Sequence, residues 1–254
     1  MKIRTITALT LSVAAGLLTQ QALAKKGGTS ILHFMLRATM TGTGTGNVEA
    51  KRNQQGGADN QRLEITVANL AAGTTYELLA STTDDTNLVA VGELTTDSAG
   101  SAVLDYVKKI HGKASPGGDL LPAGLDPISK LRSLEVSVGG TQTVLSADIT
   151  TPDTLQYLIK RAMTKDGVDT DAAASLRIKS NGSSDQLRIR ASGLDSTNTY
   201  FLAINGAVAD TLASDADGRL DVTAWPAGSP DALDVTSLAI WNSESNSVLS
   251  TTLP

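Results

Sequence analysis

Apolar and polar residues alternate with a period of two in several stretches of this chain. The alternation is clearest in residues 63–67, 134–138, 187–191 and 238–240, where Leu, Ile, Val or Ala occupies every second position. A period of two turns one side of a β-strand toward the interior and the other toward water. Residues 126–134 alone suggest a helix, with Asp126 as a cap and Pro127 in the first helical position. The pattern therefore predicts a protein built mainly of strands.

A long internal repeat organises these strands. Residues 70–79, LAAGTTYELL, return as LDSTNTYFLA at 194–203, an offset of 124 positions. Three aligned blocks keep the same order in both copies while the offset shrinks to 104: 63–78 with 187–202, 97–100 with 215–218, and 121–146 with 225–250. Order preserved over this length indicates a duplicated unit.

Each copy has the size of an ordinary domain. The boundary is expected within TTPDT, residues 150–154, which divides the chain into 25–150 and 154–254. Seven or eight short strand patterns per copy, separated by glycine-ended turns such as DSAG and DADG, favour two packed antiparallel sheets. We therefore expect an all-β fold of two tandem antiparallel β-sandwich domains, each with its own hydrophobic interior.

A tyrosine motif that occurs in both copies resembles one found in a known class of β-sandwich. The segment Leu70-x-x-Gly-Thr-x-Tyr76 resembles the tyrosine corner of fibronectin type III and immunoglobulin-like sandwiches, and Leu194 to Tyr200 is a looser copy. In that family the tyrosine lies near the domain end, whereas strand patterns follow it here. The resemblance implies immunoglobulin-like sandwiches in which the hydroxyls of Tyr76 and Tyr200 bond the upstream backbone, a structural role.

The N-terminal segment predicts export. Lys2 and Arg4 precede an apolar run that ends in Ala-Leu-Ala at 22–24, the three parts of a secretory signal peptide. The chain is similar to bacterial exported proteins that combine this strand and tyrosine motif with a T-D-x-x-G turn, here residues 95–100, and a closing V-L-S. Residues 1–24 are expected to be removed, leaving a protein of the periplasm, cell surface or medium with no membrane span.

Charge and composition limit the classes of partner that the protein can bind. Loss of Lys2 and Arg4 would change the formal charge from −5 to −7, which argues against general nucleic-acid binding. The chain has no cysteine, so burial and hydrogen bonds must replace disulfides. An envelope protein or a polysaccharide is the expected partner.

Residues suited to catalysis are scarce. A nucleophile needs a neighbouring base, and the chain contains only two histidines, His33 and His111. We therefore expect no enzyme and no cofactor, although a site assembled from scattered carboxylates remains an alternative.

Three aspartates raise the question of calcium. Asp215, Asp217 and Asp221 of DADGRLD are close in sequence, yet their spacing differs from a calcium-binding loop. Two interpretations stay open: a metal site in the second copy, or, as we favour, aspartates that cap turns.

The two copies differ where large aromatic residues replace small or polar ones. Strand alternation turns Glu77 and Ser137 outward in the first copy, and their counterparts are Phe201 and Trp241. Trp225 likewise replaces Leu121. Phe201, Trp225 and Trp241 therefore form a candidate surface for a ligand, with a sugar ring or another protein as the partner; alternatively, they cover the junction between domains or a local loop.

The first copy also carries a basic insertion. Its candidate functional residues are Lys108, Lys109, His111 and Lys113, in a Gly/Pro-containing loop. The alternative is a solvated hairpin tip. Together these features predict a non-enzymatic exported structural, adhesion or assembly protein of the envelope or extracellular space, with a carbohydrate- or ligand-binding module as the alternative.

Overall fold

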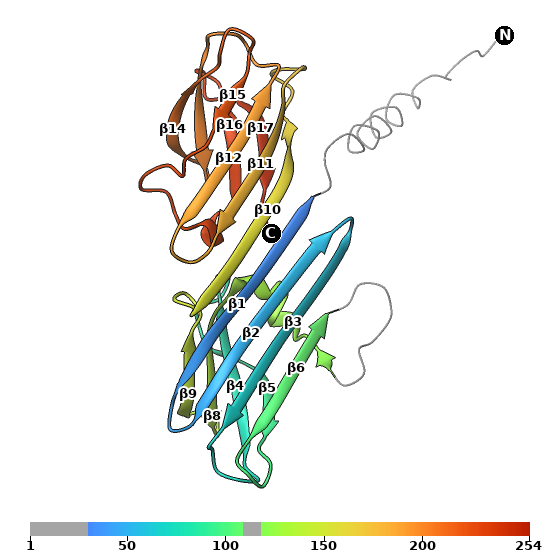
Figure 1. The fold of residues 1–254 in the computed structure, drawn as a ribbon, viewed down its shortest axis with the longest axis vertical. Coiled ribbons are helices and arrows are strands. Elements are labelled where there is room, and N and C mark those ends of the chain that lie inside the picture. The colour runs from blue at the N-terminus through green and yellow to red at the C-terminus, as the bar shows by residue number, and fades with distance from the viewer. Residues whose placement is uncertain (1–29, 109–117) are drawn as a thin grey trace, which may run out of the picture.

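The computed structural model describes residues 30–108 and 118–254, and it confirms an all-β antiparallel fold (Figure 1). Regular structure in these ranges consists of strands β1–β17 and three single 3-10 turns. All strand pairs are antiparallel except the short contact between β6 and β7. The expected signal peptide and most of the basic loop lie outside the described residues.

The largest group of strands forms one curled sheet that passes through both copies of the repeat. From edge to edge its order is β7 (Asp119–Leu120), β6 (Ala102–Lys108), β3 (Ala58–Ala68), β2 (Thr45–Gln55), β1 (Ile31–Gly42), β10 (Thr154–Lys165), β11 (Ala173–Ser180), β12 (Asp185–Ser192) and β15 (Leu220–Val222). We call this the main sheet.

The remaining strands continue from the main sheet in the same way in each copy. The end of β1 pairs with β9 (Gln142–Asp148), which leads to β8 (Leu131–Val138), β4 (Thr75–Thr82) and β5 (Val89–Thr95). The end of β10 pairs with β17 (Ser247–Thr252), which leads to β16 (Ser237–Trp241), β13 (Thr199–Ile204) and β14 (Ala207–Ala213). The second copy thus repeats the pairing order of the first.

The junction between the copies is a strand pair, where a short linker between separate interiors was expected. Seven residue pairs join β1 to β10, from Ile31 opposite Lys160 to Arg37 opposite Thr154. The buried apolar side chains of both copies belong to one contiguous cluster. Without this pairing, β1 and β10 would each expose a row of unpaired N–H and C=O groups. The structure is therefore one large curled sheet, not clearly two sandwiches.

This junction is symmetric. Phe34 lies opposite Tyr157. The two residues hold the same position in their copies, because Phe34 is seven residues before Thr41, which pairs with Ser146, and Tyr157 is seven residues before Thr164, which pairs with Ser250. Both rings are buried. An approximate two-fold axis consequently passes between them.

The predicted strand alternation is confirmed in β3 and β12, whose apolar residues at 63, 65 and 67 and at 187, 189 and 191 are buried. It is wrong at the end of β8. Ser137, expected outside, is 1% exposed, and Val138, expected inside, is 39% exposed. The bulge at this point adds the extra residue, Val144, to β9 and leaves Ser137 opposite Glu77, so Ser137 is covered on its expected face and Val138 is exposed at the end of the strand.

The expected helix at 126–134 is also wrong, because the segment supplies one 3-10 turn, η2 (Ile128–Lys130), and then strand β8. The Asp126 carboxylate binds side chains instead of capping the turn. The second copy has a counterpart, η3 (Ala232–Asp234), which the sequence comparison did not predict. A further turn, η1, spans Ala123–Leu125.

The two tyrosines make the backbone contact that defines a tyrosine corner. The Tyr76 hydroxyl accepts a hydrogen bond from the Ala71 N–H at 3.1 Å, and the Tyr200 hydroxyl accepts one from the Asp195 N–H at 2.9 Å. Both bonds reach five residues upstream. They fasten equivalent turns onto equivalent strands.

A glycine completes each of these corners. Gly100 has φ +74°, and a Cβ there would lie 2.1 Å from the Leu70 carbonyl oxygen. Gly218 repeats this, with φ +69° and the Leu194 oxygen at 2.1 Å. The backbone approach therefore requires glycine for space as well as for conformation.

We expect Gly100→Ala to lower the free energy of unfolding more than Gly73→Ala, as measured by urea denaturation. Gly73 also has positive φ, +64°, but nothing lies within 4 Å of its Cβ position. The Gly73 variant should lose about 1–2 kcal/mol from backbone strain alone, and the Gly100 variant should lose at least about 2 kcal/mol more because of the backbone clash. Equal losses would contradict the steric role of Gly100.

Candidate functional site

The structure brings two of the three candidate aromatic residues together. Phe201 on β13 lies directly opposite Trp241 on β16, and both side chains are half-buried. Glu77 and Ser137 form the equivalent cross-strand pair in the first copy. Because opposed side chains on one face are neighbours, the second copy has a paired aromatic surface where the first has a carboxylate and a hydroxyl.

Trp225 lies elsewhere, three residues after the end of β15. It is half-buried and packs against the hydrophobic core. This arrangement matches the alternative of a ring that covers a local loop, so Phe201 and Trp241 alone form the aromatic pair considered below.

The three candidate metal ligands of the second copy are each engaged in a different contact. Asp215 Oδ1 accepts hydrogen bonds from the N–H groups of Asp217 and Arg219, at 2.9 and 2.8 Å. Asp217 pairs with Arg219, and Asp221 pairs with Arg188 at 3.2 Å. Within residues 30–108 and 118–254, no three His, Asp or Glu side chains are grouped to hold a metal ion. Asp215 acts as a turn cap.

The same cap is present in the first copy. Asp97 Oδ1 accepts from the N–H groups of Ala99 and Ser101, at 2.8 and 3.0 Å. These two bonds hold the pKa of Asp97 below its ordinary value because they stabilise the charged carboxylate. The duplicated aspartate is therefore explained by the backbone turn it closes.

Of the basic loop, only Lys108 falls within the described residues; Lys109, His111 and Lys113 lie outside them. Lys108 is not a free surface cation. Its ammonium group binds the Asp126 carboxylate and lies 3.9 Å from Asp59 Oδ2. It belongs to a network of charges on the inner side of the main sheet.

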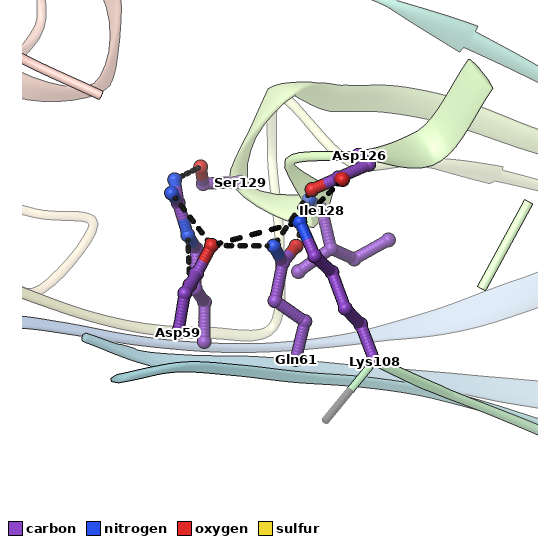
Figure 2. Close-up of polar contacts among 7 residues, drawn as sticks. Asp59, Gln61, Lys108, Asp126, Ile128 and Ser129 are labelled. Atoms are coloured by element: carbon purple, nitrogen blue, oxygen red, sulfur yellow. Dashed lines mark hydrogen bonds and ion pairs between the residues drawn. The ribbon is translucent and has the colours of Figure 1, made fainter. Parts of the chain in front are cut away.

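Figure 2 shows this network, which sequence reasoning missed. Arg52 forms a bidentate pair with Asp59, at 2.9 and 3.2 Å, and also donates to the Ser129 hydroxyl at 3.2 Å. Arg52 is 6% exposed and Asp59 8%. We call the set of Arg52, Asp59, Gln61, Lys108, Asp126 and Ser129 the polar network.

Gln61 connects the parts of the polar network. Its amide nitrogen donates to Asp59 at 2.9 Å and to Asp126 at 2.8 Å, while its amide oxygen accepts from the Ile128 N–H at 2.7 Å. Side chains of β2, β3 and β6 therefore hold the segment that carries η2. In the second copy, Asp185 takes the position of Gln61 and accepts from the Ala232 N–H at 2.9 Å.

The charges of the polar network compensate one another. It contains two cations, Arg52 and Lys108, and two carboxylates, Asp59 and Asp126. Burial alone would raise the pKa of Asp126, but hydrogen bonds from Lys108 and Gln61 outweigh it and keep that pKa below the ordinary value. The Asp126 carboxylate is thus held in its charged form by fixed partners. The arrangement fastens a loop; it has the character of a structural site.

Two shallow clefts lie outside the polar network. One, of about 500 Å³, is lined by Arg190, Arg219, Asp215 and Asp221 of the second copy. The other, of about 410 Å³, lies at the junction of the copies, where Arg132 donates to Asp234 at 2.5 Å. Arginine and aspartate are already paired in both clefts.

We expect Asp59→Ala to lower the free energy of unfolding by about 3–5 kcal/mol in urea denaturation, because it leaves the Arg52 guanidinium buried without its carboxylate. Asp221→Ala, on an ion pair that is nearly half exposed, provides the control and should cost at most about 1 kcal/mol. The double substitution R52M/D59A should recover part of the loss. Equal effects of the two single substitutions would contradict a dominant role for the buried pair.

Comparison of the chain with protein-family models, with curated proteins and with solved structures found no match. Among the described residues, no helix has the length and apolar character needed to cross a membrane. The interpretation of the site therefore depends on its own geometry.

Proposed function

We propose that this chain is a non-enzymatic exported protein with a structural, adhesion or assembly role in the bacterial envelope or outside it, built from two immunoglobulin-like sandwiches. The strand pair between β1 and β10 carries the proposal. It fixes the two copies in one continuous sheet, and the ion pair between Arg132 and Asp234 adds a contact across the same junction. A fixed, extended double unit suits a protein that holds partners at a set separation.

The immunoglobulin-like part of the proposal is supported by the order of strands within each copy. β4, β5, β8 and β9 form a group that β1 connects to the main sheet, and the tyrosine corner ties the turn before β4 to its own strand. The second copy repeats these features. The two copies therefore resemble immunoglobulin-like sandwiches in the order of strand pairing and in the geometry of the tyrosine corner.

Fractionation of cells that produce the full-length chain tests the structural role. We expect the mature protein to begin after residue 24, as measured by intact mass, and to be recovered with the insoluble envelope or extracellular matrix. The N-terminal deletion of residues 1–24 is the control and should stay in the cytoplasm. Recovery of the full-length chain as an uncleaved cytoplasmic protein would overturn the proposal.

The aromatic pair supports a second candidate function, binding of a carbohydrate. Phe201 and Trp241 are opposed on one sheet face and half-buried, which leaves part of each ring accessible. Aromatic rings can cover the apolar face of a sugar, and they are enriched at contact surfaces. The replacement of Glu77 and Ser137 by this pair makes the second copy the binding unit.

Tryptophan emission measures this second function directly. The Trp225→Phe variant leaves Trp241 as the only tryptophan, and we expect its emission to shift saturably when soluble cell-wall or matrix polysaccharides are added. Phe201→Ala should weaken the titration, because it removes half of the pair. An unchanged spectrum across a broad panel of polysaccharides would rule out sugar binding at this pair.

A further inference from the structure

The outward face of β10, β11 and β12 carries an unusual concentration of positive charge. Five exposed cations project from these three neighbouring strands, which lie side by side in the upper half of Figure 1: Lys160, Arg177, Lys179, Arg188 and Arg190. Asp221 on β15 is the carboxylate that pairs with them. We call these five cations the basic face.

Three of the cations form a row across the sheet. Lys160 is directly opposite Arg177, and Arg177 is directly opposite Arg188. Adjacent strands lie about 4.8 Å apart, and like charges placed directly opposite one another destabilise a sheet. This row of cations therefore lowers the stability of the folded state, and the fold itself does not require it.

The first copy shows that the same fold is compatible with a neutral face. The positions of Lys160, Arg177 and Arg188 correspond to Arg37, Glu49 and Glu64, which are likewise aligned across β1, β2 and β3. Two carboxylates of the first copy are thus arginines in the second.

Ion pairs neutralise the face of the first copy. Glu49 pairs with Arg37 and Lys51, and Arg62 pairs with Glu64 and Asp105. Three cations therefore balance three carboxylates. In the second copy one carboxylate, Asp221, serves Arg188 and Arg190, and Lys160, Arg177 and Lys179 have no ion pair within the part of the chain that the structure describes.

The excess charge is local, because the whole chain has a formal charge of −5. A patch whose sign opposes that of the rest of the molecule attracts an oppositely charged ligand and orients it. Arginine side chains also match the planar geometry of carboxylates, which they bind through two parallel hydrogen bonds. The basic face has the chemistry needed to hold a series of carboxylates.

We propose that the basic face binds an acidic polysaccharide, laid across β10, β11 and β12 with its carboxylates on the arginines. The face is an open sheet surface, which suits an extended polymer better than a small molecule. It contains no aromatic side chain on which nucleic-acid bases could stack. Duplex DNA has one negative charge per about 1.7 Å, so the acidic remainder of the chain would repel it on either side of the patch.

This inference goes beyond the proposed structural role and is independent of the aromatic pair. Phe201 and Trp241 lie on β13 and β16, which belong to the group of strands outside the main sheet. The two surfaces can therefore be tested separately with variants of each.

The test measures binding of the mature full chain to polygalacturonate by isothermal calorimetry at low and moderate salt. We expect R177Q/R188Q to weaken binding about tenfold or more, since each substitution removes charge-assisted hydrogen bonds to the carboxylates of the polymer. The matched control R37Q/K51Q removes the same charge from the neutral face and should change the dissociation constant less than about twofold, because those cations are already paired. F201A/W241A should bind like the wild-type protein.

Several results would overturn the inference. The first is no binding of polygalacturonate by the wild-type protein, and the second is an equal loss of affinity in R177Q/R188Q and in R37Q/K51Q. The third is tighter binding of duplex DNA or phosphatidylglycerol vesicles than of polygalacturonate at the same salt. Thermal melting checks that each variant is folded. Salt provides a second measurement that needs no substitution: raising it should weaken polygalacturonate binding by the wild-type protein, because an exposed face is screened, and binding unaffected by salt would also overturn the inference.

Discussion

Main-chain hydrogen bonding between β1 and β10 is the interaction on which the whole arrangement depends. Each of these strands begins its copy, lies in the main sheet and then continues onto β9 or β17. Each is therefore shared by the main sheet and by the second group of strands of its own copy. Because this strand pair also joins the copies, the position of every other strand is fixed relative to it.

Local pattern predicted the parts of the fold that depend on neighbouring residues. Alternation identified β3 and β12, and the repeated tyrosine and aspartate motifs marked turns that have the same hydrogen bonds in both copies. The burial of Ser137 has no such signal, because it depends on how β8 lies between β4 and β9. The junction was missed for a similar reason: main-chain pairing is available to almost any sequence of side chains.

The polar network and the basic face could not be predicted from the sequence, because both depend on the register in which distant strands pair. The polar network combines Arg52 and Gln61 with Lys108 and Asp126, which lie far apart in sequence. Lys160, Arg177 and Arg188 form a row only because β10, β11 and β12 pair in one particular register. Sequence reasoning did identify the positions of Phe201 and Trp241 as equivalent to Glu77 and Ser137, since the internal repeat supplied the alignment.

The symmetry of the junction limits how such a protein can grow. Phe34 and Tyr157 face each other across an approximate two-fold axis, so each copy offers the other the same strand edge. A self-complementary contact of this kind closes on itself, unlike a head-to-tail contact, which can continue without end. β1 already has β2 on its other side, and β10 has β11. A third copy of the unit would find this edge occupied, so it could not join the sheet through the same strand pair.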